Sequence, residues 1–257
     1  MKNLENANQL IQEKKIRWTE IFIFYVIAVF ISAPFRLKLI KLDEILPLPY
    51  GLNIFYHIFR GIGPAIGFLL IYFVFGSKVE RKLSFWGINK YYSLLAIILI
   101  PLGLTFAGVD NESELNRHYY GFLTGVMLII YALGEEYGWR GYLQQALSPM
   151  KVPYRILTIA VFWYVWHLNF MLPDFSIKTH LVFFFFLLLG SWGLLKISES
   201  TYSILFVAAV HLSFNILSDV RSNFNQKILV ILVAAFIWTL LIIFINKRKS
   251  LYPENSL

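Results

Sequence analysis

Two adjacent carboxylates and a guanidinium lie within a stretch of the chain that otherwise has the pattern of a membrane-spanning helix. The residues are Glu135, Glu136 and Arg140. A charged side chain at the bilayer centre costs roughly 2.5–3.5 kcal/mol on insertion scales, so such residues usually face the protein interior and mark a functional site. A desolvated glutamate is suited to act as a general base that takes a proton from water.

Two later apolar segments each carry a histidine. His167 follows Trp163 by four residues and Asn215 follows His211 by four, so each pair shares one helix face. An imidazole can donate to a developing oxyanion, hold a water or ligate a metal, and a carboxamide N–H can also serve the oxyanion. With a glutamate base, these groups could hydrolyse an amide without a serine or cysteine nucleophile.

Depth within the membrane predicts that these groups form one site. A rise of about 1.5 Å per residue places Glu135 roughly 18 Å from the cytoplasmic end of its span, and His167 and His211 roughly 20 and 15 Å into theirs. Arg140 follows Glu136 by four residues in the favourable order, so we expect it to neutralise and orient Glu136 and leave Glu135 as the freer base. Three glycines would let a neighbouring helix or a peptide backbone approach closely: Gly134, Gly138 and Gly141.

The elements that must position these residues are predicted to be transmembrane helices. About 20 apolar residues cross a bilayer, and eight segments qualify: about 18–35, 52–75, 91–107, 119–147, 154–172, 178–197, 201–218 and 228–246. We therefore predict an all-α fold, a polytopic membrane bundle of about eight transmembrane helices with an intramembrane polar cavity. A single transmembrane domain is expected over residues 1–257, with a motif-bearing core at about 119–218.

Composition supports this class of protein. The chain is 58% hydrophobic and 15% charged, whereas soluble domains are about 45–50% apolar and about 25% charged. The net charge of +8 comes largely from short loops, a topogenic pattern, so membrane lipid is expected as a partner and nucleic acid is not. There are no cysteines, which excludes disulfides, a thiolate nucleophile and cysteine metal sites.

The distribution of basic residues predicts a multi-pass protein of the cell membrane with both termini cytoplasmic. That orientation places most basic loop residues on one side: Lys14, Lys15, Arg17, Lys78, Arg81, Lys82, Lys151, Arg155, Lys247, Arg248 and Lys249. The segment 36–41 is basic yet would lie outside, and we interpret it as an interfacial amphipathic piece.

The order and spacing of the three motifs resemble the CPBP family of intramembrane metalloproteases, the CAAX-protease and bacteriocin-processing group also called Abi or type II CAAX prenyl endopeptidases. Glu135, Glu136 and Arg140 match its first motif, His167 its second, and His211 with Asn215 its third. The chain departs from the family at Trp163, where phenylalanine is usual. The motifs cover about residues 131–216. The resemblance implies an eight-helix bundle, a cavity that opens to the cytoplasmic side, and Glu135 as the catalytic base.

The predicted function is that of an intramembrane endopeptidase acting on a membrane-associated peptide or small protein. Glu135 would activate water, the two histidines and Asn215 would position the water or the oxyanion, and Glu136 with Arg140 would hold the geometry. Zinc is an open question, because Glu135, His167 and His211 could bind it with one position open or could work without a metal. Abundant Ile, Phe, Asn and Lys hint at a bacterial source, which would favour leader peptides, pheromones or bacteriocins over prenylated proteins as substrates.

Three alternatives remain at this level. The charged cluster could merely order the bundle. The chain could be a non-catalytic bacteriocin-immunity or scaffolding membrane protein of the same fold. It could also be a transporter or proton relay, although no internal repeat is evident. Other protease classes are disfavoured, because the sequence has no His-Glu-x-x-His motif, no paired aspartates in spans and no rhomboid-type serine motif.

Overall fold

The computed structural model describes residues 15–112, 114–171 and 176–251. These residues form helices and no strand, apart from an isolated bridge between Ser84 and Ser203. The all-α prediction is therefore confirmed. The longer helices are α2 (Trp18–Arg36), α6 (Lys90–Ala107), α7 (Arg117–Gly138), α9 (Val152–His167), α10 (Ile177–Thr201), α11 (Ile204–Asp219) and α12 (Phe224–Leu251). The shorter pieces are α3 (Leu42–Ile45), η1 (Leu52–His57), α4 (Ile58–Gly61), α5 (Gly63–Leu69), η2 (Leu70–Val74), η3 (Trp139–Leu143), α8 (Gln144–Ala146) and η4 (Asn169–Met171).

Each of the eight predicted spans coincides with a helical stretch. Four helices, α2, α6, α10 and α12, are long and apolar enough to cross a membrane, and a fifth span results if the bent pair Leu52–Gly61 and Gly63–Val74 counts as one. Of the remaining three predicted spans, the first matches α7 together with α8, the second matches α9 and the third matches α11. Helix α7 carries the charged motif, while α9 and α11 have 16 residues each. The number eight stays a prediction.

Polar caps set where the helices that carry the site begin. The side chain of Asn116 accepts two backbone N–H bonds at the start of α7, and Ser203 accepts one from Phe206 at the start of α11. Helix α9 ends at His167 because Leu168 adopts a left-handed backbone conformation with φ of 58°. Helix α9 therefore ends before the predicted end of its span at about residue 172, which lies outside the described residues.

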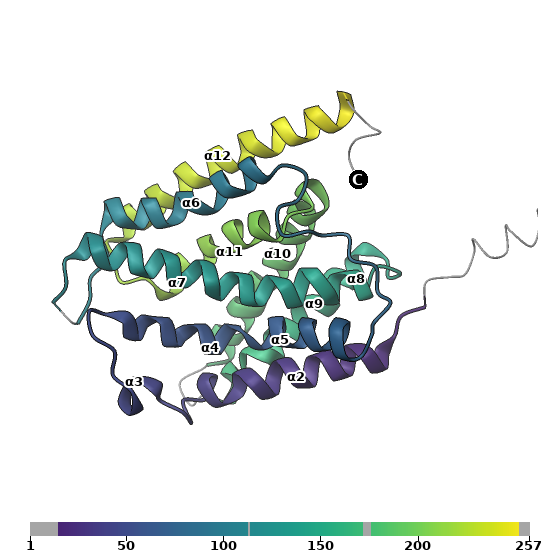
Figure 1. Ribbon diagram of the computed structural model, residues 1–257, viewed down its shortest axis with the longest axis horizontal. Helices are drawn as coiled ribbons and strands as arrows, with labels where there is room; N and C mark the ends of the chain where they lie inside the picture. The colour runs from purple at the N-terminus through teal and green to yellow at the C-terminus, as the bar shows by residue number, and fades with distance from the viewer. Residues whose placement is uncertain (1–14, 113, 172–175, 252–257) are drawn as a thin grey trace, which may run out of the picture.

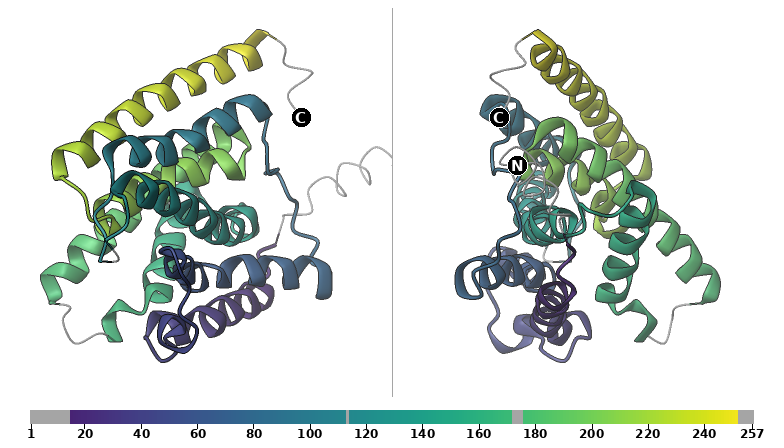
Figure 2. Two further views of the ribbon diagram at one scale, coloured as in Figure 1. Left: turned by 60° about the vertical axis from the view of Figure 1, so that its left-hand side comes forward. Right: turned by 90° about the vertical axis from the view of Figure 1, so that its right-hand side faces the viewer.

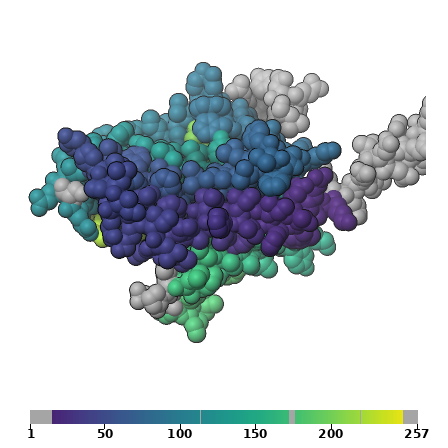
Figure 3. Space-filling view, turned by 60° about the horizontal axis from the view of Figure 1, so that its bottom comes forward, coloured from purple at the N-terminus to yellow at the C-terminus, as the bar shows by residue number. Residues whose placement is uncertain are grey.

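Helix α7 lies at the centre of the bundle (Figures 1 and 2). It packs against α5 on one side and against α6 and α11 on the other, while α2 lies along α5 and α12 along α6. Two buried apolar clusters result, one formed mainly by α6, α7, α11 and α12, and one that includes α2, α5, η3 and α9. The charged motif lies where these two clusters meet. Helix α2 and the segment after it cover one face of the molecule (Figure 3).

The bend in the second predicted span comes close to the glutamate pair. The two halves of that span meet at 54°, and a Cβ added at Gly138 would lie 2.3 Å from the Cβ of Pro64. A Cβ added at Gly134 would lie 2.9 Å from the carbonyl oxygen of Gly61. The predicted close approach is confirmed at these two glycines. At Gly141 the nearest atom, on the Phe68 ring, would be in ordinary contact at 3.4 Å, so close approach there stays a prediction.

The long axis of the molecule has two distinct ends. The terminal end, on the right in Figure 1, holds the start of α2, the end of α12 and the segments 76–89 and 198–203; there Ser77 donates a 2.6 Å hydrogen bond to Glu20. The loop end, on the left, holds α3 and the segments 108–116 and 220–223, and there the Asp110 N–H donates a 2.8 Å bond to the Arg221 carbonyl. The predicted topogenic residue Lys14 lies outside the described residues.

Candidate active site

Glu136, Arg140 and His211 form a buried charged cluster between α7 and α11. Arg140 Nη1 donates to Glu136 Oε1 at 3.3 Å, and Nε lies 3.3 Å from Oε2. His211 Nδ1 lies 2.6 Å from Glu136 Oε1. All three side chains are at most 4% exposed. The expected pairing of Arg140 with Glu136 is therefore confirmed, and Glu136 serves as the acceptor that orients His211.

Glu135 points to a different set of partners. The indole N–H of Trp163 donates to its Oε2 at 2.7 Å, and Arg36 Nη2 lies 3.7 Å from its Oε1. The side chain is 1% exposed. Glu135 is therefore held less closely than Glu136, which contacts both Arg140 and His211, but it also has a cation and a hydrogen-bond donor of its own. Each of the two glutamates faces a separate arginine.

Arg36 is a site residue that the sequence analysis did not identify. It is the last residue of α2 and is 6% exposed. Its Nε donates to the carbonyl of Arg60 and its Nη2 to the hydroxyl of Tyr131, both at 2.9 Å. Its guanidinium carbon lies 3.5 Å from the centre of the Trp166 ring. The interfacial interpretation of segment 36–41 is thus wrong for Arg36, which turns inward.

Trp163 lies in the middle of the predicted residues. Its ring centre is 6.1 Å from that of His167 and 5.2 Å from that of His211, and the Arg140 guanidinium carbon lies 4.7 Å from it. Trp163 also holds Glu135 through its indole N–H. The structure thus gathers four predicted residues around this single indole, namely Glu135, Arg140, His167 and His211. Glu136 joins them through Arg140 and His211.

The hydrogen bonds of the two imidazoles define what their rings can do. His167 Nδ1 lies 2.7 Å from the backbone carbonyl of Trp163, and a carbonyl only accepts, so this nitrogen carries the proton. A neutral His167 then presents an unprotonated Nε2, which can accept a hydrogen bond from water. His211 faces the Glu136 carboxylate through Nδ1, and it donates from both nitrogens when protonated. The two rings can therefore play different roles.

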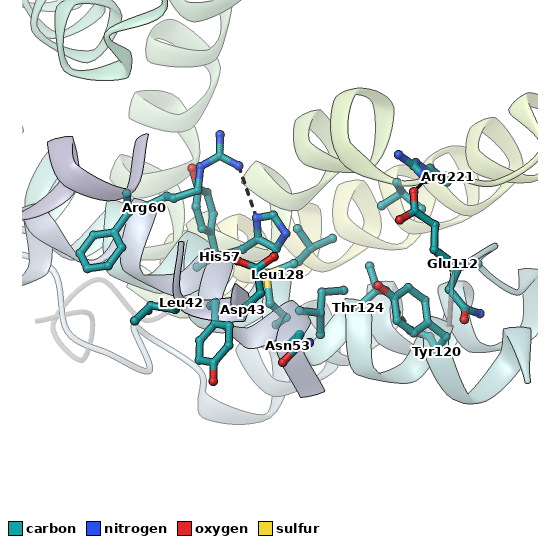
Figure 4. Close-up of a pocket in the computed structure, with 18 of the residues that line it drawn as sticks. Leu42, Asp43, Asn53, His57, Arg60, Glu112, Tyr120, Thr124, Leu128 and Arg221 are labelled. Atoms are coloured by element: carbon teal, nitrogen blue, oxygen red, sulfur yellow. Dashed lines mark hydrogen bonds and ion pairs between the residues drawn. The ribbon is translucent and has the colours of Figure 1, made fainter. Parts of the chain in front are cut away.

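Asn215 lies one helical turn after His211 and is buried. It lines a cavity of about 830 Å³ that reaches the loop end, together with Tyr131 and Thr124 of α7. Figure 4 shows this cavity, with Asp43, His57 and Arg60 on one side and Glu112 and Arg221 on the other. Of the six predicted site residues, Asn215 is the one that lines the cavity. The other five are not among the residues that line it.

A metal site has no geometric support in the part of the chain that the structure describes. No group of three His, Cys, Asp or Glu side chains there could hold a metal ion. Two arginines also flank the carboxylates, because Arg36 lies beside Glu135 and Arg140 beside Glu136. The ligand set Glu135, His167 and His211 stays a prediction.

The fold and the site define a helical membrane protein with two acids, two arginines and His211 buried between its helices and a partly buried His167 beside them. Residues 118–217, from α7 to α11, match the family model described as type II CAAX prenyl endopeptidase Rce1-like. This match confirms the resemblance drawn from the motifs and covers all six predicted site residues. The family is a protease family, which supports an enzymatic role. Searches of curated proteins and of solved structures found no match.

Proposed function

We propose that this protein is an intramembrane endopeptidase that hydrolyses a peptide bond of a membrane-associated peptide or small protein by glutamate-activated water. The observation that supports this most strongly is the environment of Glu135. Its two carboxylate oxygens face the Trp163 indole N–H and the Arg36 guanidinium, beside an indole that contacts both histidines. A buried carboxylate with fixed donors on one side and imidazoles nearby has the parts of a general base and its supporting groups.

In the proposed reaction, Glu135 takes a proton from water while the water oxygen attacks the scissile carbonyl carbon. The unprotonated Nε2 of His167 accepts a hydrogen bond from the second hydrogen of the water, which stays on the attacking oxygen, and so orients the nucleophile. The carbonyl oxygen becomes an oxyanion, which the Asn215 amide and protonated His211 stabilise by donating N–H bonds. The C–N bond then breaks, and Glu135 returns its proton to the leaving amine. Glu136 and Arg140 act through His211 by fixing its ring.

Comparison of membrane peptides tests this function in cells. Cells that carry the native protein and cells that carry Glu135→Gln would be compared by mass spectrometry of their membrane and secreted peptides. We expect a defined set of cleavage products to depend on the intact glutamate. Identical peptide sets would reject the proposal, and full bacteriocin protection by Glu135→Gln would instead favour the non-catalytic immunity or scaffolding alternative.

Trp163→Phe, which installs the residue usual in the family, is expected to lower kcat about ten-fold. The change removes the N–H donor to Glu135, and a hydrogen bond to a charged group contributes about 1.5 kcal/mol or more, equivalent to about ten-fold in rate. KM should stay near its native value, because the indole is not among the residues that line the cavity. The control is Trp192→Phe on the exposed face of α10. Equal kinetics for native protein and Trp163→Phe would argue against a role for this donor.

Treatment with a zinc chelator is expected to leave cleavage intact. Arg36 and Arg140 already place positive charge beside the two carboxylates, so a metal cation is not required to neutralise them. The measurement is the rate of peptide cleavage by purified protein after chelation, with metal content determined in the same sample. Loss of activity that added zinc restores would show that the metal-dependent version of the mechanism is the right one.

A further inference from the structure

The cavity beside the site opens at the loop end of the bundle. Its outer wall is formed by α3, by the segment 109–112 and by Val220 with Arg221, and its inner wall by Tyr131, Thr124 and Asn215. Both the start of α2 and the end of α12 lie at the other end of the long axis (Figure 1). Substrate that uses this cavity therefore approaches from the side opposite to the start of α2 and the end of α12.

Charge distinguishes the two ends. The terminal end carries an excess of basic residues: Arg17, Lys78, Arg81, Lys82, Lys151 and Arg155. At the loop end, acids balance bases, as in the exposed pairs Lys41 with Glu44 and Arg221 with Glu112. An excess of lysine and arginine marks cytoplasmic segments. The terminal end is then cytoplasmic and the cavity faces outward, whereas the family resemblance implied an opening on the cytoplasmic side.

We propose that the substrate reaches the site from the extracytoplasmic face through this cavity, and that the part of it bound there is a hydrophilic peptide without a lipid group. This inference rests on the proposed protease function. The cavity volume of about 830 Å³ lies in the range of ligand pockets, about 300–1,000 Å³. Its lining contains charges of both signs, such as Asp43 and Arg60, and several amides and hydroxyls. A prenyl chain would desolvate these groups without offering them a hydrogen bond, whereas peptide backbone and polar side chains can bond with them.

A short path joins the cavity to the base. Tyr131 lines the cavity and accepts a 2.9 Å hydrogen bond from Arg36 Nη2. The same nitrogen lies 3.7 Å from Glu135 Oε1. Asn215 reaches the cavity from α11, one turn from His211. A peptide in the cavity is thus separated from Glu135 by one tyrosine–arginine pair, and its scissile carbonyl can meet the Asn215 amide first.

Thiol labelling tests the orientation without reference to activity. The chain contains no cysteine, so single variants give an unambiguous signal. Asp43→Cys places a thiol at the exposed rim of the cavity, and Lys82→Cys places one at the exposed terminal end. A membrane-impermeant maleimide added to intact cells should label Asp43→Cys, and it should label Lys82→Cys only after permeabilisation. The reverse pattern would overturn the inference even if the protein proves to be a protease.

Blocking the cavity tests the route. A bulky maleimide attached to Asp43→Cys on intact cells should strongly reduce the peptides that depend on Glu135, whereas the same label on Lys178→Cys, exposed at the start of α10, should not. Unchanged products after complete labelling at position 43 would overturn the route, and so would Glu135-dependent products that carry a prenyl group or derive from cytoplasmic sequence. If no peptide depends on Glu135, the proposed function itself fails, while the labelling pattern still decides the orientation.

Discussion

Glu135→Gln is expected to lower the rate of peptide cleavage by a factor of about 10²–10⁴, the usual contribution of general acid–base catalysis. Glutamine has nearly the same shape, and its amide oxygen can still accept the Trp163 N–H bond. Arg36 keeps its bonds to the Arg60 carbonyl and the Tyr131 hydroxyl and its contact with Trp166. The variant therefore loses the proton acceptor and retains the local packing.

The measurement is the single-turnover rate of the purified variant in detergent, with one of the Glu135-dependent peptides as substrate. A thermal unfolding curve on the same sample separates a chemical defect from a folding defect. Glu20→Gln is a matched control, because Glu20 lies at the terminal end and bonds Ser77 and Arg17. A Glu135→Gln variant with the native rate would remove Glu135 from its role as base.

Arg140→Leu is expected to destabilise the protein by about 3–5 kcal/mol, because removing one partner of a buried ion pair leaves the other charge uncompensated. Glu136 would keep His211 as its remaining polar partner in a fully buried position. Denaturation in mixed micelles would measure the loss. We expect the double variant Glu136→Gln/Arg140→Leu to recover much of the lost stability, because both charges of the pair are then removed and no buried charge is left without its partner.

The control for this prediction is Arg155→Leu. Arg155 pairs with Glu199, whose side chain is 43% exposed, and partly solvated pairs contribute about 1 kcal/mol or less. Native-like stability of Arg140→Leu, or a double variant no more stable than the single one, would contradict the view that Glu136 depends on Arg140.

Apolar length and charge made the helical segments predictable, because a bilayer requires about 20 apolar residues wherever the chain crosses it. The predicted segment 18–35 differs from α2 by one residue. The rise per residue also correctly placed Glu135 at the level of His211. It gave no information about rotation around the helix axes, and for this reason the partners of Glu135 could not be predicted. That this carboxylate faces both Trp163 and Arg36 depends on how α2, α7 and α9 pack.

Arg36 shows this limit most clearly. In the sequence it is one basic residue among several after an apolar segment, which is also the pattern of an interfacial anchor. Its inward direction follows from contacts with Arg60, Tyr131 and Trp166, residues up to 130 positions away in the chain. The bend beside Gly134 was likewise hidden, because glycine and proline in a span indicate that a break is possible without giving its direction.

The π-helical turn Trp139–Leu143 follows the glutamate pair after Tyr137 and Gly138. A π turn holds one residue more than a regular turn, and one residue rotates an α-helix by about 100°. A relative that lacks the extra residue would keep Glu135 and Glu136 in place and present a different face of α8 to α10. Alignments of this region therefore need a one-residue gap inside the wide turn, since ungapped pairing would put every later position, such as the buried Leu147, one residue out of register.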